Sequence, residues 1–129
     1  MIILYYGVSS RTSRQAIAWL NDYKIEVNKK RIERITRKDL KHILLLSENG
    51  FPDILKSARG SGTHIHTIRE QIKSSSFENA LDCLMEHQDI LKVPIIFDDH
   101  RLVIGYNSET IRTFITHEYR KSERYLSNW

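Results

Sequence analysis

The residue pattern of this 129-residue chain predicts an α/β fold with a mixed sheet, helices on both faces and an inserted helical segment. An apolar strand pattern is followed closely by a helical pattern at the N-terminus, and two more strand patterns flank a turn near residue 100. The long segment between the N-terminal elements and the two later strands shows helical periodicity and no strand pattern. The resulting order, β-α-β, helical insert, β-β-α, is typical of helices layered on a sheet.

The N-terminal part is predicted to contain a strand, a helix and a second strand. Residues 2–6 form an apolar strand, and residues 10–23 form a helix with apolar residues at helical spacing. These apolar residues are Ala16, Trp19, Leu20 and Tyr23. Residues 25–27 alternate between apolar and polar side chains, which predicts a second strand beside the first.

The first helix of the insert is expected to begin at Thr36. The pair Thr36-x-x-Asp39 resembles a capping box. Its buried stripe consists of Leu40, Ile43 and Leu44. We expect Gly50 to end this helix as a left-handed cap. Pro52 favours a first helical position, so a short helix is predicted over 52–57.

Two more helices complete the insert. The first is predicted around 67–72, and Ser75-x-x-Glu78 forms a capping box for the second. The stripe of this second helix consists of Phe77, Ala80, Leu81 and Leu84.

The C-terminal part contains two strands and a helix. Residues 94–97 and 102–104 are apolar runs, and 98–101 form the hairpin turn between them. Ser108 is the expected N-cap of the last helix. Its apolar residues are Ile111, Phe114 and Ile115.

Composition bounds the class of protein. Apolar residues make up 40% and charged residues 28% of the chain, which fits a globular domain with a core of its own. No apolar run approaches the roughly 20 residues that span a bilayer, and residues 2–6 are too short for the apolar part of a signal peptide. A single cysteine, Cys83, excludes an internal disulfide, so we expect a cytoplasmic protein with no membrane partner.

Positive charge is concentrated in the first third of the chain. The net charge is +4, and residues 1–45 hold ten Lys or Arg against four Asp or Glu. Most of the excess lies in the basic run 29–41. Such a run can face nucleic acid or an acidic protein, or it can be an ordinary solvated surface. No aromatic residue interleaves it, which disfavours a surface that stacks bases.

The start of the first helix carries the most informative residues. A strand, a tight turn and a helix that begins with C-x-x-C form the thioredoxin-like redox signature. Here the two cysteine positions hold Ser10 and Ser13. Two serines cannot form a disulfide, and a serine hydroxyl without a general base is a poor nucleophile. We therefore interpret both as degenerate redox positions that cap the helix, and we expect no catalytic residue.

Several segments, in a specific order and spacing, resemble the Spx and arsenate reductase (ArsC-like) family. They are Tyr5, 16–20, 48–50, Glu86-His87, 94–96, Arg101-Leu102 and 105–107. The resemblance runs from Met1 to about Arg120, and the block 86–114 is closer to the Spx regulators than to the reductases.

The resemblance implies one thioredoxin-like domain over 1–117. The sheet and its packed helices come from 1–30 and 90–117, and the helical insert covers 35–88. Residues 118–129 are expected to form a flexible tail.

For function, the resemblance offers two branches. The Spx branch binds the C-terminal domain of the RNA polymerase α subunit and redirects transcription, whereas the reductase branch uses a cysteine nucleophile on arsenate. With serines at both redox positions, we expect an Spx-type transcriptional regulator without a disulfide switch and without a cofactor. The alternatives are a reductase-like enzyme that uses an external thiol and a degenerate member that binds another protein.

Two further partners are implied by the Spx branch. Promoter DNA is met only within the polymerase complex, and the ClpXP protease removes many Spx proteins through a short apolar C-terminus. The ending Leu126-Ser127-Asn128-Trp129 departs from that pattern.

The resemblance also implies which residues bind the α subunit. Gly50 lies in the segment that grips the α C-terminal domain, although a glycine here also serves as a plain helix cap. Leu45 is an extra apolar residue beside this segment and a candidate contact. The first helix forms the other side of the surface, which makes Ser10, Arg11 and Arg14 candidate rim contacts.

A residual anion site is a second candidate. A helix N-terminus favours an anion, and Arg59 matches an anion-binding arginine of the family. Val93 stands where the family usually has an arginine before the strand proline. By resemblance, Pro94 follows a cis peptide bond; on spacing alone, an ordinary trans proline at a strand end is the alternative.

The cysteine and two histidines complete the candidates. Cys83 lies on a helix with apolar neighbours and is predicted to be a buried small residue rather than a redox thiol. His64 and His66 could ligate a metal, but the sequence offers no convincing third ligand, so we predict no metal site.

Overall fold

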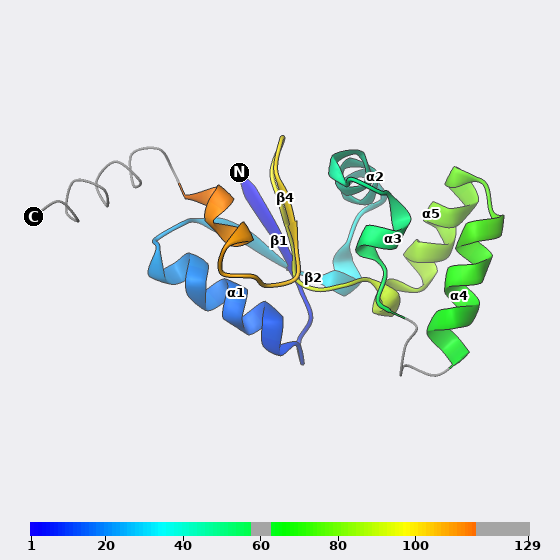
Figure 1. Cartoon of the computed structure of the whole chain (residues 1–129), viewed down its shortest axis with the longest axis horizontal. Helices are drawn as coiled ribbons and strands as arrows, with labels where there is room; N and C mark the ends of the chain where they lie inside the picture. The colour runs from blue at the N-terminus through cyan, green and yellow to red at the C-terminus, as the bar shows by residue number, and fades with distance from the viewer. Residues whose placement is uncertain (58–62, 116–129) are drawn as a thin grey trace, which may run out of the picture.

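The computed structural model of the chain describes residues 1–57 and 63–115 (Figure 1). Its four-stranded sheet has the order β2-β1-β3-β4, in which β1 and β2 are parallel and the other pairs are antiparallel. The strands are β1 (Ile2–Tyr6), β2 (Val27–Arg31), β3 (Ile95–Phe97) and β4 (Leu102–Ile104). This is the predicted mixed α/β sheet.

Helices cover both faces of the sheet. Figure 1 shows α1 (Arg11–Asp22) and the 3-10 helix η3 (Thr110–Phe114) on one side and the helices of the insert on the other. The insert consists of η1 (Ile32–Arg34), α2 (Arg37–Leu46), α3 (Phe51–Ile54), α4 (Thr63–Ser74), α5 (Phe77–Glu86) and η2 (Gln88–Ile90). The predicted domain boundary at 117 and the tail 118–129 lie outside the described residues.

Alternation along β1 creates two separate cores. Successive side chains of a strand point to opposite faces. Leu4 therefore packs with Ala16 and Leu20 of α1, whereas Tyr5 packs with the apolar residues of the insert. Both Leu4 and Tyr5 are completely buried.

The second strand differs from its predicted bounds of 25–27. Lys24 adopts a positive φ of 56°, and the backbone N–H of Ile25 donates to the carbonyl of Leu20. These contacts close the end of α1 and leave the strand to begin at Val27. The basic residues that follow therefore lie on β2, an edge strand of the sheet.

Two predicted caps are wrong by one residue. Ser76, not Ser75, caps α5, because its hydroxyl accepts from the backbone N–H of Asn79 at 3.3 Å. Ser75 instead donates to the carbonyl of Gln71 at the end of α4. Asn107, not Ser108, accepts from the backbone N–H groups that open the last helix, which is a short 3-10 helix rather than an α-helix.

The helix bounds of the insert also differ from prediction. α3 is a single turn that ends before 55–57, because Leu55 pairs as an isolated bridge with Leu91. α4 is longer than the predicted 67–72 and begins at Thr63. The start of α2 is as predicted, since the Thr36 hydroxyl accepts from the Asp39 backbone N–H at 3.0 Å.

A polar contact at the buried face of β1 joins the sheet to the insert. The hydroxyl of Tyr5 donates to Oδ2 of Asp39 at 2.5 Å, and the Tyr5 ring stacks on Phe97 at 6.2 Å between centroids. Burial, with the hydrogen bond to the Asp39 carboxylate, raises the pKa of Tyr5 above its ordinary value of 10.0. The phenol is therefore held as a neutral donor between the two parts.

The first prediction concerns this contact. Tyr5→Phe should lower the free energy of unfolding by about 1–2 kcal/mol at neutral pH, because a charge-assisted hydrogen bond is lost. The unfolded tyrosine ionises near its ordinary pKa of 10.0 and the folded one resists ionisation. The parent should therefore lose stability as pH rises above 10, and Tyr5→Phe should lose less.

Urea denaturation at neutral and alkaline pH measures both effects. Tyr6→Phe is the matched control, because Tyr6 lies on the other face of the same strand. Equal alkaline loss in the parent and in Tyr5→Phe would contradict the assigned role of Tyr5.

Candidate functional site

Two serines form hydrogen bonds with the backbone at the start of α1. Ser10 is the N-cap, and its Oγ accepts from the backbone N–H of Ser13 at 3.1 Å. The side chain of Ser13 is buried, and its Oγ accepts from the backbone N–H of Gly7 at 3.2 Å. The predicted capping role is thus confirmed for Ser10, whereas Ser13 instead satisfies the strand-to-helix turn.

The strand proline lies directly beside this turn. The Val93–Pro94 peptide bond is cis, as the resemblance predicts. Thr12 donates to the carbonyl of Val93 at 3.1 Å. A Cβ on Gly7 would lie 3.1 Å from a methyl carbon of Val93, so any larger residue here would push Val93 aside.

The hollow at this helix start has mixed charge. It encloses about 380 Å³ and is lined by Gly7, Val8, Ser9, Ser10, Ile32, Glu33, Lys56, Gln88, Asp89, Leu91 and Val93. Among these lining residues, Glu33 and Asp89 are acidic and Lys56 is basic. Two carboxylates oppose the binding of an oxyanion. The anion ligand expected from the sequence, Arg59, lies outside the described residues.

Gly50 occupies a turn that hydrogen bonds hold in place. Its φ of 79° and ψ of −136° suit glycine, and a Cβ there would meet no atom within 4 Å. The hydroxyl of Ser47 accepts from the Gly50 backbone N–H at 3.0 Å and donates to the carbonyl of Leu44 at 2.6 Å. Gly50 is the N-cap of α3, not the C-cap of α2, because α2 already ends at Ser47 in an extended conformation.

Asp53 closes the same turn from the other side. Its carboxylate accepts from the backbone N–H of Asn49 at 2.8 Å and from the Asn49 side-chain amide at 3.1 Å. These hydrogen bonds from Asn49 hold the pKa of Asp53 below its ordinary value. The turn therefore presents Gly50 in one fixed backbone conformation.

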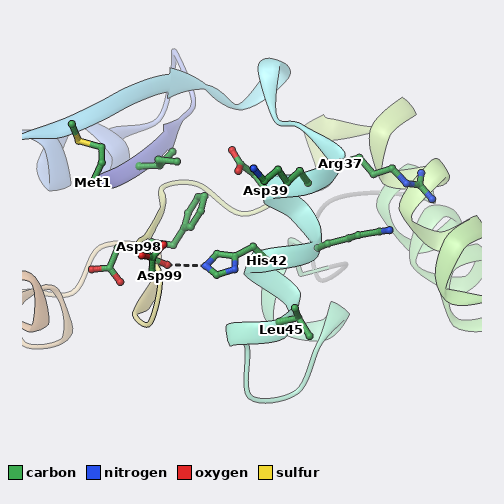
Figure 2. Close-up of a pocket in the computed structure, with 11 residues that line it drawn as sticks. Met1, Arg37, Asp39, His42, Leu45, Asp98 and Asp99 are labelled. Atoms are coloured by element: carbon green, nitrogen blue, oxygen red, sulfur yellow. Dashed lines mark hydrogen bonds between the residues drawn. The ribbon is translucent and has the colours of Figure 1, made fainter.

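Leu45 stands out as an exposed apolar side chain on α2. It is 83% exposed, whereas its neighbour Leu46 packs against the core. Leu45 borders a groove of about 670 Å³ that reaches Met1, which is also 83% exposed (Figure 2). Across the groove, His42 Nε2 donates to the backbone carbonyl of Asp98 at 2.9 Å.

The residues expected to form the partner surface come from two places in the fold. Leu45 and Gly50 lie at the end of α2 and in the turn that follows it. Ser10, Arg11 and Arg14 lie on the first turns of α1. Figure 1 shows the start of α1 and the α2–α3 region well apart.

The basic run 29–41 is also divided. Arg37 forms ion pairs with Glu78 and Asp82 of α5, and Lys41 lies 3.6 Å from Glu78. The hydrogen bond from Arg37 holds the pKa of Glu78 below its ordinary value. Lys30 lies 6.0 Å from the centre of the Tyr5 ring. Arg37 and Lys41 therefore tie α2 to α5.

Cys83 and the histidines differ from their predicted environments. Cys83 is half-buried rather than fully buried, and its Sγ lies 3.9 Å from a side-chain oxygen of Gln71. His66 points to solvent, whereas His64 lies within reach of His87 and Asp89. Sequence spacing missed this cluster, because its members lie 23 and 25 residues apart from His64.

The fold and its helix start define a class of thioredoxin-like domains with a helical insert. The chain belongs to the ArsC family, whose model matches residues 5–114. Among the described residues, no helix is long and apolar enough to cross a membrane.

Two curated relatives are Spx regulators. The chain is 34% identical over 125 residues to the global transcriptional regulator Spx of Streptococcus pneumoniae, covering 95% of this chain and 92% of that protein. It is also 34% identical to the global transcriptional regulator Spx 1 of Lactococcus lactis, with 95% of each chain covered.

Solved structures share the fold. An ArsC family related protein of Bacteroides fragilis gives a TM-score of 0.73 at 16% identity, covering 88% of this chain and 96% of that one. An arsenate reductase of Vibrio cholerae gives 0.67 at 13% identity, covering 89% and 97%. The predicted thioredoxin-like α/β fold and the family resemblance are confirmed.

Proposed function

We infer that this protein is an Spx-type transcriptional regulator that binds the C-terminal domain of the RNA polymerase α subunit and has no disulfide switch. The observation that carries this proposal is the likeness to Spx regulators along 95% of the chain. Promoter DNA is then contacted only within the polymerase complex. The segment that ClpXP would read, 126–129, lies outside the described residues.

The chemistry of the helix start supports a non-catalytic protein. Both serine oxygens accept backbone N–H groups, and no thiol is present at either position. The helix-start hollow also has two carboxylates on its lining, which disfavour an arsenate oxyanion. A reductase needs a thiolate nucleophile, and the residues at the two redox positions are the serines Ser10 and Ser13, which supports the non-catalytic proposal.

The α2–α3 region supports a binding role. Leu45 is exposed close to the Gly50 turn, and Ser47 and Asp53 fix that turn. An ordered backbone without a side chain lets a partner approach closely, and a nearby apolar side chain supplies buried area. We assign Gly50 and Leu45 to the centre of the α-binding surface, with Ser10, Arg11 and Arg14 as a second, separate contact.

The second prediction tests that surface. Gly50→Arg and Leu45→Asp should each reduce the affinity for the α C-terminal domain by at least about tenfold, because central contacts of an interface dominate its energy. Calorimetry measures the affinity, and circular dichroism confirms folding. Leu45→Asp should remain as stable as the parent, since the side chain is already 83% exposed.

Gly50→Ala is the matched control. It carries the same backbone strain as Gly50→Arg, about 1–3 kcal/mol, but no long side chain. It should therefore bind α within a few-fold of the parent. Normal binding by both Gly50→Arg and Leu45→Asp, or no binding by the parent, would rule out the proposed surface and favour a family member that binds another protein.

The third prediction concerns redox. Burial, followed by the negative charge of Glu86, raises the pKa of the Cys83 thiol, so little reactive thiolate forms. Diamide should change the affinity for α by less than about twofold in both the parent and Cys83→Ser. A large change in the parent that disappears in Cys83→Ser would reveal a thiol switch at Cys83.

The fourth prediction tests the enzyme alternative. The purified protein should reduce arsenate no faster than a protein-free control when glutathione or thioredoxin supplies the thiol. The reason is that no thiolate stands at the start of α1. Turnover that Ser10→Ala abolishes would establish the reductase-like alternative instead.

A further inference from the structure

Three potential metal ligands meet at one end of the insert. His64 lies in the first turn of α4, His87 ends α5, and Asp89 lies in η2. One ligand atom from each lies within 4.8 Å of the other two. His64 Nε2 is 3.2 Å from Oδ2 of Asp89, and the two imidazole rings are 5.8 Å apart between centroids.

These distances suit a small divalent cation. Bonds of about 2.0–2.2 Å at tetrahedral angles place donor atoms roughly 3.4 Å apart. The pair formed by His64 and Asp89 already meets that spacing. His64 is exposed and His87 is half-buried, so the His64 imidazole has room to adjust to an ion.

The backbone that carries the ligands is anchored at a common point. Leu55 pairs with Leu91, Lys56 N–H donates to the carbonyl of Ile90, and Lys92 N–H donates to the carbonyl of Ile54. This bridge fixes η2.

The helix that carries His64 is fastened to the same bridge. Arg69 of α4 donates to the carbonyl of Lys56 at 2.9 Å. The ligands His87 and Asp89 are held relative to each other by the hydrogen bond from Ile90 N–H to the His87 carbonyl. Both α4, which carries His64, and η2, which carries Asp89, are therefore anchored to the same backbone bridge. This anchoring limits the conformational entropy that is lost when a metal binds.

We propose that His64, His87 and Asp89 form a binding site for one divalent transition-metal ion of the zinc type. Two imidazole nitrogens and one carboxylate oxygen suit Zn²⁺ and its neighbours in the series better than Mg²⁺ or Ca²⁺, which prefer oxygen ligands alone. Three protein ligands leave a fourth position for water or a small ligand.

The position of the site gives it a structural consequence. A bound ion would clamp the first turn of α4 to η2. Asp89 also lines the hollow at the degenerate helix start. This inference does not depend on the proposed binding of RNA polymerase.

Titration of the full chain with Zn²⁺ alone tests the site. Calorimetry should show saturable binding of a single ion, and the thermal midpoint should rise with Zn²⁺ because the ion binds the folded state. His64→Ala, His87→Ala and Asp89→Asn should each weaken binding by at least about tenfold, since even the loss of an outer-shell partner costs that much.

His66→Ala is the matched control, because His66 is an exposed histidine on the same helix outside the cluster. It should leave the affinity unchanged. Circular dichroism identifies any variant that fails to fold. Asp89→Asn is near-isosteric, so it is expected to fold even if a histidine variant does not.

A Co²⁺ spectrum checks the ligand set. Binding should produce visible d–d bands without a thiolate charge-transfer band, although Cys83 lies one helical turn before His87. Absence of saturable binding by the parent, unchanged affinity in both histidine variants, or a thiolate band that Cys83→Ser removes would each overturn the proposed site.

Discussion

The hydrogen bond from the buried Tyr5 hydroxyl to Asp39 is the constraint on which the arrangement of this chain depends. The sheet separates two apolar cores, and the insert must cover the face to which Tyr5 points. Apolar packing can hold the insert there but does not fix its position, because hydrophobic contact is not directional. A buried phenol demands a partner, and the first turn of α2 supplies it. The same Asp39 offers its backbone N–H to the Thr36 cap, so one residue fixes both the start of α2 and its position on the sheet.

That anchoring determines where the candidate surfaces lie. The first turn of α2 is held at Tyr5. At the other end of α2, Leu45 is exposed, and the chain then enters the Gly50 turn. The insert must then return to the sheet at Pro94, beside the start of α1. A partner that grips the Gly50 region and a ligand at the helix start therefore meet different parts of the molecule.

Periodicity and local chemistry predicted the sheet, the faces of α1 and α2, the Thr36 cap and the capping role of Ser10, because these depend on neighbours within a few residues. The predictions that failed depend on tertiary contacts. Gly50 has the positive φ expected of a cap, but Ser47 ends α2 first and the glycine opens α3. His64 lies near His87 and Asp89, which spacing along the sequence does not show, because α5 and η2 bring these residues close across the fold. The cis bond before Pro94 was predicted from family resemblance, since spacing alone does not distinguish the two isomers.

The two serines at the start of α1 meet the hydrogen-bonding needs of the turn. The turn before α1 needs an acceptor for the Gly7 N–H and a cap for the first turn, and hydroxyl oxygens meet both needs better than sulfur, which is a weak acceptor. Val93 then packs against Gly7, where the family usually has a guanidinium group. Each replacement favours an ordered turn over a reactive one. For the regulator proposed above, this ordered turn serves recognition rather than chemistry, and control of its activity then acts on its amount, on its partner, or on the insert where His64, His87 and Asp89 converge.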